Sequence, residues 1–103
     1  MTPEQAAQGF AAMGSEARLA ILRALVRAGS GGLTVGEIGA RTGVPASTLA
    51  HHLKFLVASG VLEQERAGRS VITRAAFDHL QALAQFILGE CCADQEKKAA
   101  NDG

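Results

Sequence analysis

The chain has 103 residues, a hydrophobic fraction of 48%, four Phe as its only aromatic residues and a formal net charge of zero. This length fits one domain and leaves little room for a second core. No apolar run approaches the roughly 18 residues that a membrane span needs, and no signal-like leader opens the chain, so we expect a cytoplasmic protein. A small domain this rich in aliphatic residues often covers apolar surface with a partner subunit, which favours a dimer.

The neutral total conceals charges that are segregated along the chain. Residues 41–74 hold five Lys and Arg against two Glu, a net charge of +3. Residues 75–103 hold two Lys against five Asp and Glu, a net charge of −3. A local excess of positive charge is what contact with nucleic acid phosphates requires.

Two helices are predicted in the first third of the chain. Thr2-Pro3-Glu4-Gln5 is typical of a helix start, with Thr as the N-cap, Pro at the first helical position and Gln reaching back. This helix is expected to end at Gly14, and Ser15 then caps a second helix. The apolar face of the second helix consists of Leu19, Leu22, Leu25 and Val26.

Residues 34–59 predict two further helices joined by a tight turn. Thr34 and Glu37 have the spacing of a capping box, and Gly43 suits a left-handed helix end. Pro45 then precedes a helix over residues 46–59, whose buried stripe is Leu49, Leu53, Leu56 and Val57. In this helix-turn-helix arrangement the second helix enters the major groove of DNA.

A hairpin and a last helix complete the predicted fold. Residues 61–66 and 69–74 flank Ala67-Gly68 and predict a two-stranded hairpin, the wing of a winged helix-turn-helix. From about Ala75 a helix carries apolar residues at steps of three and four, the spacing of a helix that packs along another: Phe77, Leu80, Leu83, Ala84, Ile87, Leu88 and Cys91. The fold class is therefore mainly α (α+β), with about five helices and the hairpin. Residues 1–92 are the domain and residues 93–103 a polar, flexible tail.

The candidate DNA contacts lie on the second helix of the helix-turn-helix and on the hairpin. The buried stripe leaves four polar side chains on or beside the face offered to the groove, namely Ser47, Thr48, His51 and Lys54. His52, at the edge of the stripe, is predicted to bond a backbone group or a phosphate. Arg66 and Arg69 are placed to follow the DNA backbone or to enter the minor groove. Because no Asn, Gln or Arg lies on the exposed face, shape and backbone contacts should contribute heavily to specificity.

This region has two other interpretations. A helix-turn-helix can also be a protein-interaction module with a solvated basic rim, and the charge segregation together with the hairpin favours DNA. Adjacent helical residues project about 100° apart, so His51 and His52 do not face one metal ion.

Cys91 and Cys92 are the only cysteines and are adjacent, so they cannot staple a long loop, and the expected compartment is reducing. Their sulfurs converge only if the last helical turn unwinds, which Gly89 and the polar tail favour. Three interpretations stay open: a ligand site for a soft acceptor, a redox or persulfide sensor, and a small apolar residue beside an exposed bystander. No base is positioned to activate either thiol, so we do not expect an enzyme.

The segments SEARLAILRAL and LTVGEIGARTGVPASTLAHHLKFLVASGVL, followed by the Gly-Arg wing, closely resemble the ArsR/SmtB family of metal-responsive transcriptional repressors. The resemblance covers about residues 10–92. It implies a homodimer through the first and last helices that binds a pseudo-palindromic operator in double-stranded DNA and releases it when an inducer binds. Ser47, Thr48 and His51 match base-facing positions of the family, and His52-Leu53 matches its frequent His-Leu pair.

The resemblance also bears on the inducer. Arsenic- and cadmium-binding relatives often carry Cys-x-Cys where this chain has Thr34-Val35-Gly36, and Asp78-His79 lacks the second His of a zinc site on the last helix. Leu88-Gly89-Glu90-Cys91-Cys92 resembles the C-terminal Cys-Cys signature of an arsenic-responsive branch. It implies release of DNA when arsenite or methylarsenite binds Cys91 and Cys92, with no constitutive cofactor. The alternative is a thiol-based redox or persulfide-sensing regulator.

Overall fold

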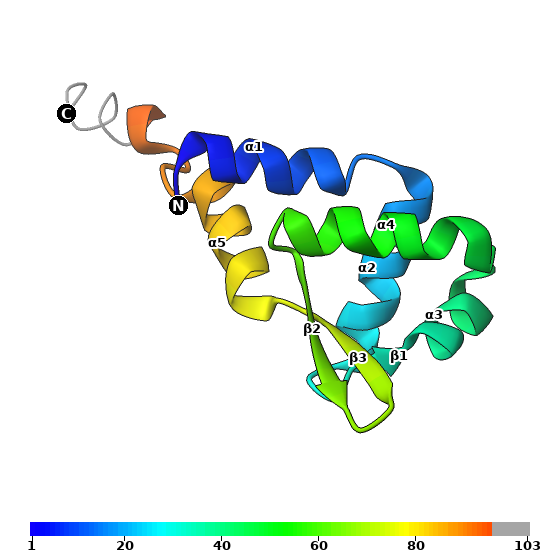
Figure 1. Ribbon diagram of the computed structural model, residues 1–103. Helices are drawn as coiled ribbons and strands as arrows, with labels where there is room; N and C mark the ends of the chain where they lie inside the picture. The colour runs from blue at the N-terminus through cyan, green and yellow to red at the C-terminus, as the bar shows by residue number, and fades with distance from the viewer. Residues whose placement is uncertain (96–103) are drawn as a thin grey trace.

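The computed structural model describes residues 1–95, which form five helices and a three-stranded antiparallel sheet (Figure 1). The helices are α1 (Pro3–Ala12), α2 (Glu16–Ala28), α3 (Val35–Thr42), α4 (Ala46–Ala58) and α5 (Phe77–Leu88). The strands are β1 (Leu33–Thr34), β2 (Leu62–Ala67) and β3 (Ser70–Ala75), in the sheet order β1-β3-β2. The predicted flexible tail lies mostly in residues 96–103, outside the described residues.

The predicted order of helices, turn and hairpin is confirmed. The capping box of α3 is formed, because Thr34 Oγ1 accepts from the Glu37 amide at 3.2 Å and Glu37 Oε1 accepts from the Thr34 amide at 2.9 Å. Gly43, at a φ of 72°, ends α3 in the left-handed region. Pro45 N-caps α4, so the helix-turn-helix spans α3 and α4 as the spacing predicts.

The sheet contains one strand more than predicted. β1 pairs with β3, with Leu33 opposite Thr73 and Thr34 opposite Ile72. A strand of two residues is too short to show an alternating pattern in the sequence. The pairing needs a glycine before it, because a Cβ on Gly32, at a φ of 69°, would lie 2.5 Å from the Thr73 carbonyl oxygen.

Two predicted helix faces differ from the structure. On α2 the buried side chains are Ile21, Leu22 and Leu25, whereas Leu19 and Val26 stay 44% and 45% exposed. α5 ends at Leu88, so the prediction that Cys91 lies on this helix is wrong. The reason is local, since Gly89 caps α5 and the chain turns immediately after it.

The core lies between α2, α3, α4 and the sheet. Its largest fully buried side chains include Ile21 and Leu25 of α2, Ile38 of α3, and Leu49 and Leu56 of α4. These aliphatic side chains hold the second helix of the helix-turn-helix against the rest of the domain. Among the described residues Thr73 is the one buried polar side chain, and its hydroxyl accepts a hydrogen bond from Gln64 Nε2 at 3.0 Å.

Helices α1 and α5 approach each other closely at a glycine. A Cβ on Gly9 would lie 2.9 Å from Leu83 Cδ1, and Leu83 is the buried residue of α5. α1 also runs alongside α4 on its other side (Figure 1). α1 is therefore in contact with both the last helix and the second helix of the helix-turn-helix.

None of the helices within residues 1–95 combines the length and the apolar character needed to cross a bilayer.

The capping box of α3 predicts an acid-sensitive contribution to stability. Hydrogen bonds from the Thr34 amide and hydroxyl hold the pKa of the Glu37 carboxyl below its ordinary value of 4.5. A carboxyl with a lowered pKa in the folded state stabilises the protein above its unfolded pKa, and that stability is lost as the pH falls through the folded pKa.

Glu37→Gln keeps the reciprocal hydrogen bond, as Gln5 does in α1, and should remove this dependence. We expect the urea midpoint of the native protein to fall more steeply than that of Glu37→Gln between about pH 5 and pH 3. Parallel curves would contradict this expectation.

Candidate nucleic-acid interface and cysteine pair

Four polar side chains line the exposed side of α4. Leu49, Leu53 and Leu56 are buried on the inner face of this helix. Exposed on it are Ser47, Thr48, His51 and Lys54. Thr48 Oγ1 donates to the Pro45 carbonyl at 3.2 Å, which fixes its rotamer and leaves the hydroxyl oxygen free to accept. The face predicted from the buried stripe is therefore the face that the helix presents.

The two histidines of α4 differ in exposure. His51 is exposed, whereas His52 is half-buried. The Nδ1 atom of His52 is shielded from solvent and has no hydrogen-bond partner within residues 1–95. Their ring centroids are 6.2 Å apart. Of the two, His51 is the side chain that solvent reaches fully, and a DNA contact by either histidine remains a prediction.

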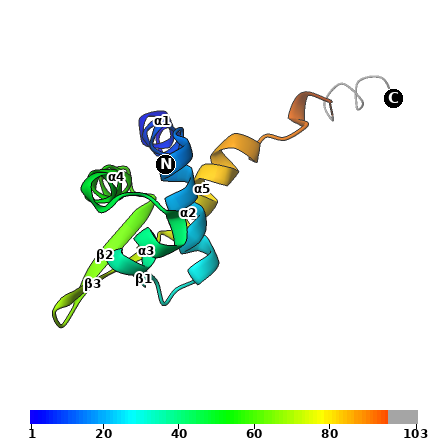
Figure 2. The same ribbon diagram turned by 90° about the vertical axis from the view of Figure 1, so that its right-hand side faces the viewer.

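The hairpin projects away from the core. Every β2 residue after Leu62 is exposed, so both faces of this strand meet solvent. Gly68, at a φ of 64°, opens the two-residue turn between the paired residues Ala67 and Ser70. Arg66 and Arg69 are both exposed near this tip. Figure 2 shows α4 and the hairpin on the same side of the molecule, with the end of α5 on the other.

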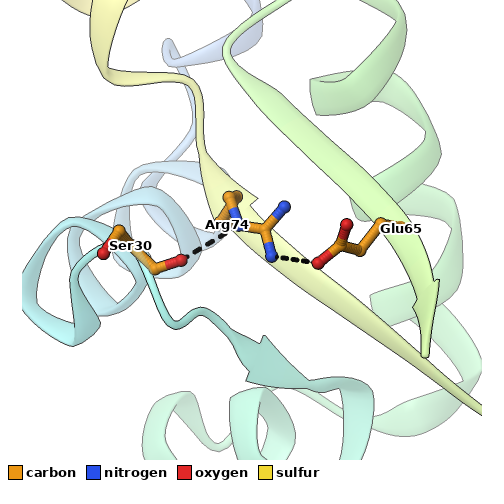
Figure 3. A network of polar contacts seen from close by, with 3 residues as sticks. All are labelled: Ser30, Glu65 and Arg74. Carbon is orange, nitrogen blue, oxygen red and sulfur yellow. Dashed lines mark hydrogen bonds and ion pairs between the residues drawn. The ribbon is translucent and has the colours of Figure 1, made fainter.

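One positively charged residue of the hairpin, Arg74, is already held by hydrogen bonds within the protein. Arg74 Nη2 donates to Glu65 Oε1 at 2.6 Å across the hairpin, and its Nε donates to the Ser30 carbonyl at 3.1 Å (Figure 3). The contact with the Glu65 carboxylate raises the pKa of the Arg74 guanidinium. This network ties the base of the hairpin to the loop after α2. Arg74 thus has a structural role, and the exposed positive charges of this surface are those of Lys54, Arg66 and Arg69.

The cysteine pair lies where the chain leaves α5. The Cys91 amide donates to the Leu88 carbonyl at 2.8 Å, and Cys92 has a φ of 63°. That value is uncommon for a non-glycine residue. It breaks the helical divergence of consecutive side chains, and the two Sγ atoms are 3.3 Å apart. Both residues are exposed free cysteines. The predicted condition for convergence, an unwound last turn, is met.

Among the described residues, no further ligand group accompanies the two thiols. Within residues 1–95 no three His, Cys, Asp or Glu side chains are grouped so that they could hold a metal ion. Thr34 and Val35 stand at the start of α3, so this helix start offers no thiol ligand. The His79 ring packs against the backbone of Gly60, so a Cβ there would lie 2.9 Å from its Cε1 atom. What the arrangement offers is a two-thiol site.

One polar connection was not predicted from the sequence. Arg18 of α2 is half-buried and contacts both α1 and Phe55 of α4. Periodicity assigns a helix face and carries no information on how far a long side chain reaches along a neighbouring helix. The signal was therefore absent from the sequence.

Comparisons with known proteins agree with this geometry. A family model described as a helix-turn-helix domain matches residues 13–65. An ArsR-like transcriptional regulator from Rhodococcus sp. RHA1 is 28% identical, with 95% of this chain and 89% of that chain covered and a TM-score of 0.77. The homodimeric winged helix-turn-helix DNA-binding domain Mb0332 from Mycobacterium bovis, a possible ArsR-family regulator, is 29% identical, with 84% and 81% covered and a TM-score of 0.68.

A third solved structure carries the same fold, the transcriptional repressor BigR from Xylella fastidiosa, at 25% identity, 85% and 96% coverage and a TM-score of 0.64. No curated protein matches the sequence. These relatives are described as transcriptional regulators or repressors and not as enzymes. The family model covers just over half of the chain. This protein accordingly belongs to the helix-turn-helix domain family and has the DNA-binding fold of ArsR-family transcriptional regulators.

Proposed function

We propose that this protein is a homodimeric transcriptional repressor that releases its operator when a trivalent arsenical, arsenite or methylarsenite, binds Cys91 and Cys92. The observation that carries the sensing half of this proposal is the 3.3 Å separation of two exposed thiols. Thiolate bonds to a metal such as zinc are about 2.3 Å long. Two bonds of that length meeting near a right angle span about 3.3 Å, so the sulfurs already have the spacing of a chelating pair.

The DNA half of the proposal rests on the exposed face of α4. We place α4 in the major groove, with Ser47, Thr48 and His51 toward base edges and Lys54 on a phosphate. Arg66 and Arg69 of the wing contact the flanking backbone. His52 is assigned a phosphate or backbone contact from its family position alone. In a dimer the two α4 helices enter successive major grooves about 34–36 Å apart.

The dimer is proposed from apolar surface on the last helix. Ile87 and Leu88 are 64% and 60% exposed, and Phe86 is also exposed. Aliphatic side chains this exposed at one helix end are typical of an interface between subunits. The Mycobacterium bovis relative is homodimeric. An interface through α1 and α5 places the cysteine pair of each subunit directly after the helix that joins the subunits.

The binding chemistry needs no oxidant. Each thiol replaces one hydroxyl group of the arsenical, so two As–S bonds form, two As–O bonds break, and the two thiol protons leave in two water molecules. A methylated arsenical then keeps its carbon bond as the third bond. Arsenite keeps a hydroxyl group or takes a small thiol, because the described residues group no third ligand with the pair. Soft sulfur ligands favour such a soft acceptor over hard cations.

Release requires only a modest coupling. A coupling free energy of about 1–3 kcal/mol lowers operator affinity by about 5- to 150-fold. Chelation fixes the turn after α5 and changes how its end packs in the dimer. The angle between the two α4 helices changes with it, and successive grooves are then no longer matched.

A redox or persulfide sensor is the second candidate, because at 3.3 Å the two sulfurs are in non-bonded contact, and a disulfide of about 2.05 Å would need them to approach further. In that case an oxidant takes two electrons from the pair and both protons leave as an S–S bond forms. The two candidates differ in their trigger and are separated by the experiment on the cysteines below.

The proposed phosphate contact of Lys54 predicts a change in salt dependence. For a duplex selected by the protein from a random-sequence library, Lys54→Gln should weaken binding and reduce the slope of log affinity against log salt by about 1. Fluorescence anisotropy over a series of salt concentrations measures this slope. Arg27→Gln, which removes an exposed charge of α2, is the control and should leave the slope unchanged. An equal slope for Lys54→Gln and the native protein would remove Lys54 from the interface.

The cysteine pair predicts selective loss of induction. Cys91→Ser and Cys92→Ser should bind the selected duplex as the native protein does, since neither residue lies near α4. Both should fail to release it when methylarsenite is added. Exposed serine replaces cysteine with little cost in folding stability.

The same assay decides between the candidates. Release of the native protein by polysulfide or peroxide, with no response to arsenicals, would favour the redox sensor. Release by methylarsenite that persists in both variants would show that Cys91 and Cys92 are not the arsenical-binding site.

A further inference from the structure

Arg18 connects three helices through one side chain. Its backbone amide donates to the Ser15 N-cap at 3.1 Å, which fixes the residue in the first turn of α2. Its Nε donates to the carbonyl of Ala12, the last residue of α1, at 2.7 Å. Its guanidinium carbon lies 4.7 Å from the centre of the Phe55 ring on α4. The end of α1 and the DNA-reading helix are thus held by the same planar group.

Each half of this contact is physically favourable. The last turn of α1 contains no basic residue of its own, and the final carbonyls of a helix have no intrahelical N–H donor. A guanidinium there satisfies one carbonyl and opposes the negative end of the helix dipole. On the other side, a cation over an aromatic face is attracted by the ring quadrupole. Lys could not make both contacts with the same geometry, because its ammonium is a point charge without the planar fork.

Part of the boundary between α1 and α4 is open to solvent. A groove of about 330 Å³ lies between them, lined by Gln8, Ala11, Phe55, Ala58 and Ser59. Phe55 remains 44% exposed even with the guanidinium over its ring. A displacement of α1 therefore reaches α4 more directly through Arg18 than through this open groove.

A movement of α5 would be passed on to α1 through their close contact at Gly9. At Gly9 the α1 backbone approaches Leu83 so closely that a Cβ would lie 2.9 Å from its Cδ1 atom. No side chain of Gly9 cushions this contact, so a shift of α5 pushes the α1 backbone directly. A continuous path of contacts then runs from the helix before the cysteines through Leu83, Gly9 and Ala12 to Arg18 and Phe55.

We propose that Arg18 is a positioning residue that couples the α1–α5 contact to the orientation of the DNA-reading helix α4. Arg18 touches no DNA in this role and acts through Phe55. The proposal deepens the function proposed above, because it assigns the route by which the end of α5 changes DNA affinity. Its central step, from α1 to α4, is tested without any arsenical.

The test is a double-mutant cycle on duplex affinity, using the full chain and the selected duplex. Gly9→Ala inserts a methyl group 2.9 Å from Leu83 Cδ1, and because Leu83 is buried we expect α1 to be displaced as well as the leucine side chain. In the native background we expect it to weaken duplex binding about five-fold, within the range of coupling between contacting sites. In the Arg18→Lys or Phe55→Leu background, where the connection is broken, it should weaken binding less than about two-fold. Arg23→Lys, an exposed arginine on the same helix, is the matched control and should leave the five-fold effect intact.

Independent, multiplying effects of Gly9→Ala and Arg18→Lys would overturn the role of Arg18. A purely structural Arg18 lowers affinity or melting temperature in each background and leaves the Gly9→Ala ratio unchanged. Should Gly9→Ala fail to fold, Leu83→Val alters the same contact and the same comparison applies. Methylarsenite added to the native protein reports separately on sensing: a missing response with an intact cycle rejects the proposed inducer and keeps the coupling residue.

Discussion

The orientation of α4 depends on the burial of three leucines. Leu49, Leu53 and Leu56 are almost fully buried against the core. Removing one such side chain costs roughly 2–5 kcal/mol, a large share of the 5–15 kcal/mol that stabilises a typical domain. No side-chain hydrogen bond caps the start of α4. The packed stripe therefore decides which side of the helix faces outward, and Ser47, His51 and Lys54 are presented only because that stripe is buried.

Electrostatics on this side of the molecule are sparser than the residue count suggests. Residues 41–74 carry a net charge of +3, but Arg74 is paired with Glu65 and bonded to Ser30. The exposed cations of α4 and the hairpin, Lys54, Arg66 and Arg69, are few for a DNA-binding surface. In the proposed complex two copies double their number and align them with successive grooves, so dimerisation would contribute to affinity as well as to specificity.

Local signals in the sequence were sufficient to predict the five helices, the hairpin and the exposed face of α4. Capping residues such as Thr34, a left-handed Gly43 and the spacing of Leu49, Leu53 and Leu56 each act within a few residues, so they can be read without tertiary structure. What escaped prediction depends on contacts between distant parts of the chain. β1 exists only as a partner of β3, and the reach of Arg18 to α1 and α4 is a property of helix packing. The end of α5 was predicted only in part: the apolar spacing extended the helix to Cys91, whereas Gly89, which favours unwinding there, ends it at Leu88.

The segment after α5, which contains the cysteine pair, and helix α4 lie on different sides of the molecule (Figure 2), so the proposed sensing requires a conformational link between them. The most direct measurement is one titration of the native dimer on its selected duplex with methylarsenite, following bound arsenic per chain and anisotropy of the DNA together. We predict one arsenic per chain, loss of both free thiols and DNA release in proportion to occupancy. Full occupancy of Cys91 and Cys92 with the duplex still bound would contradict the account.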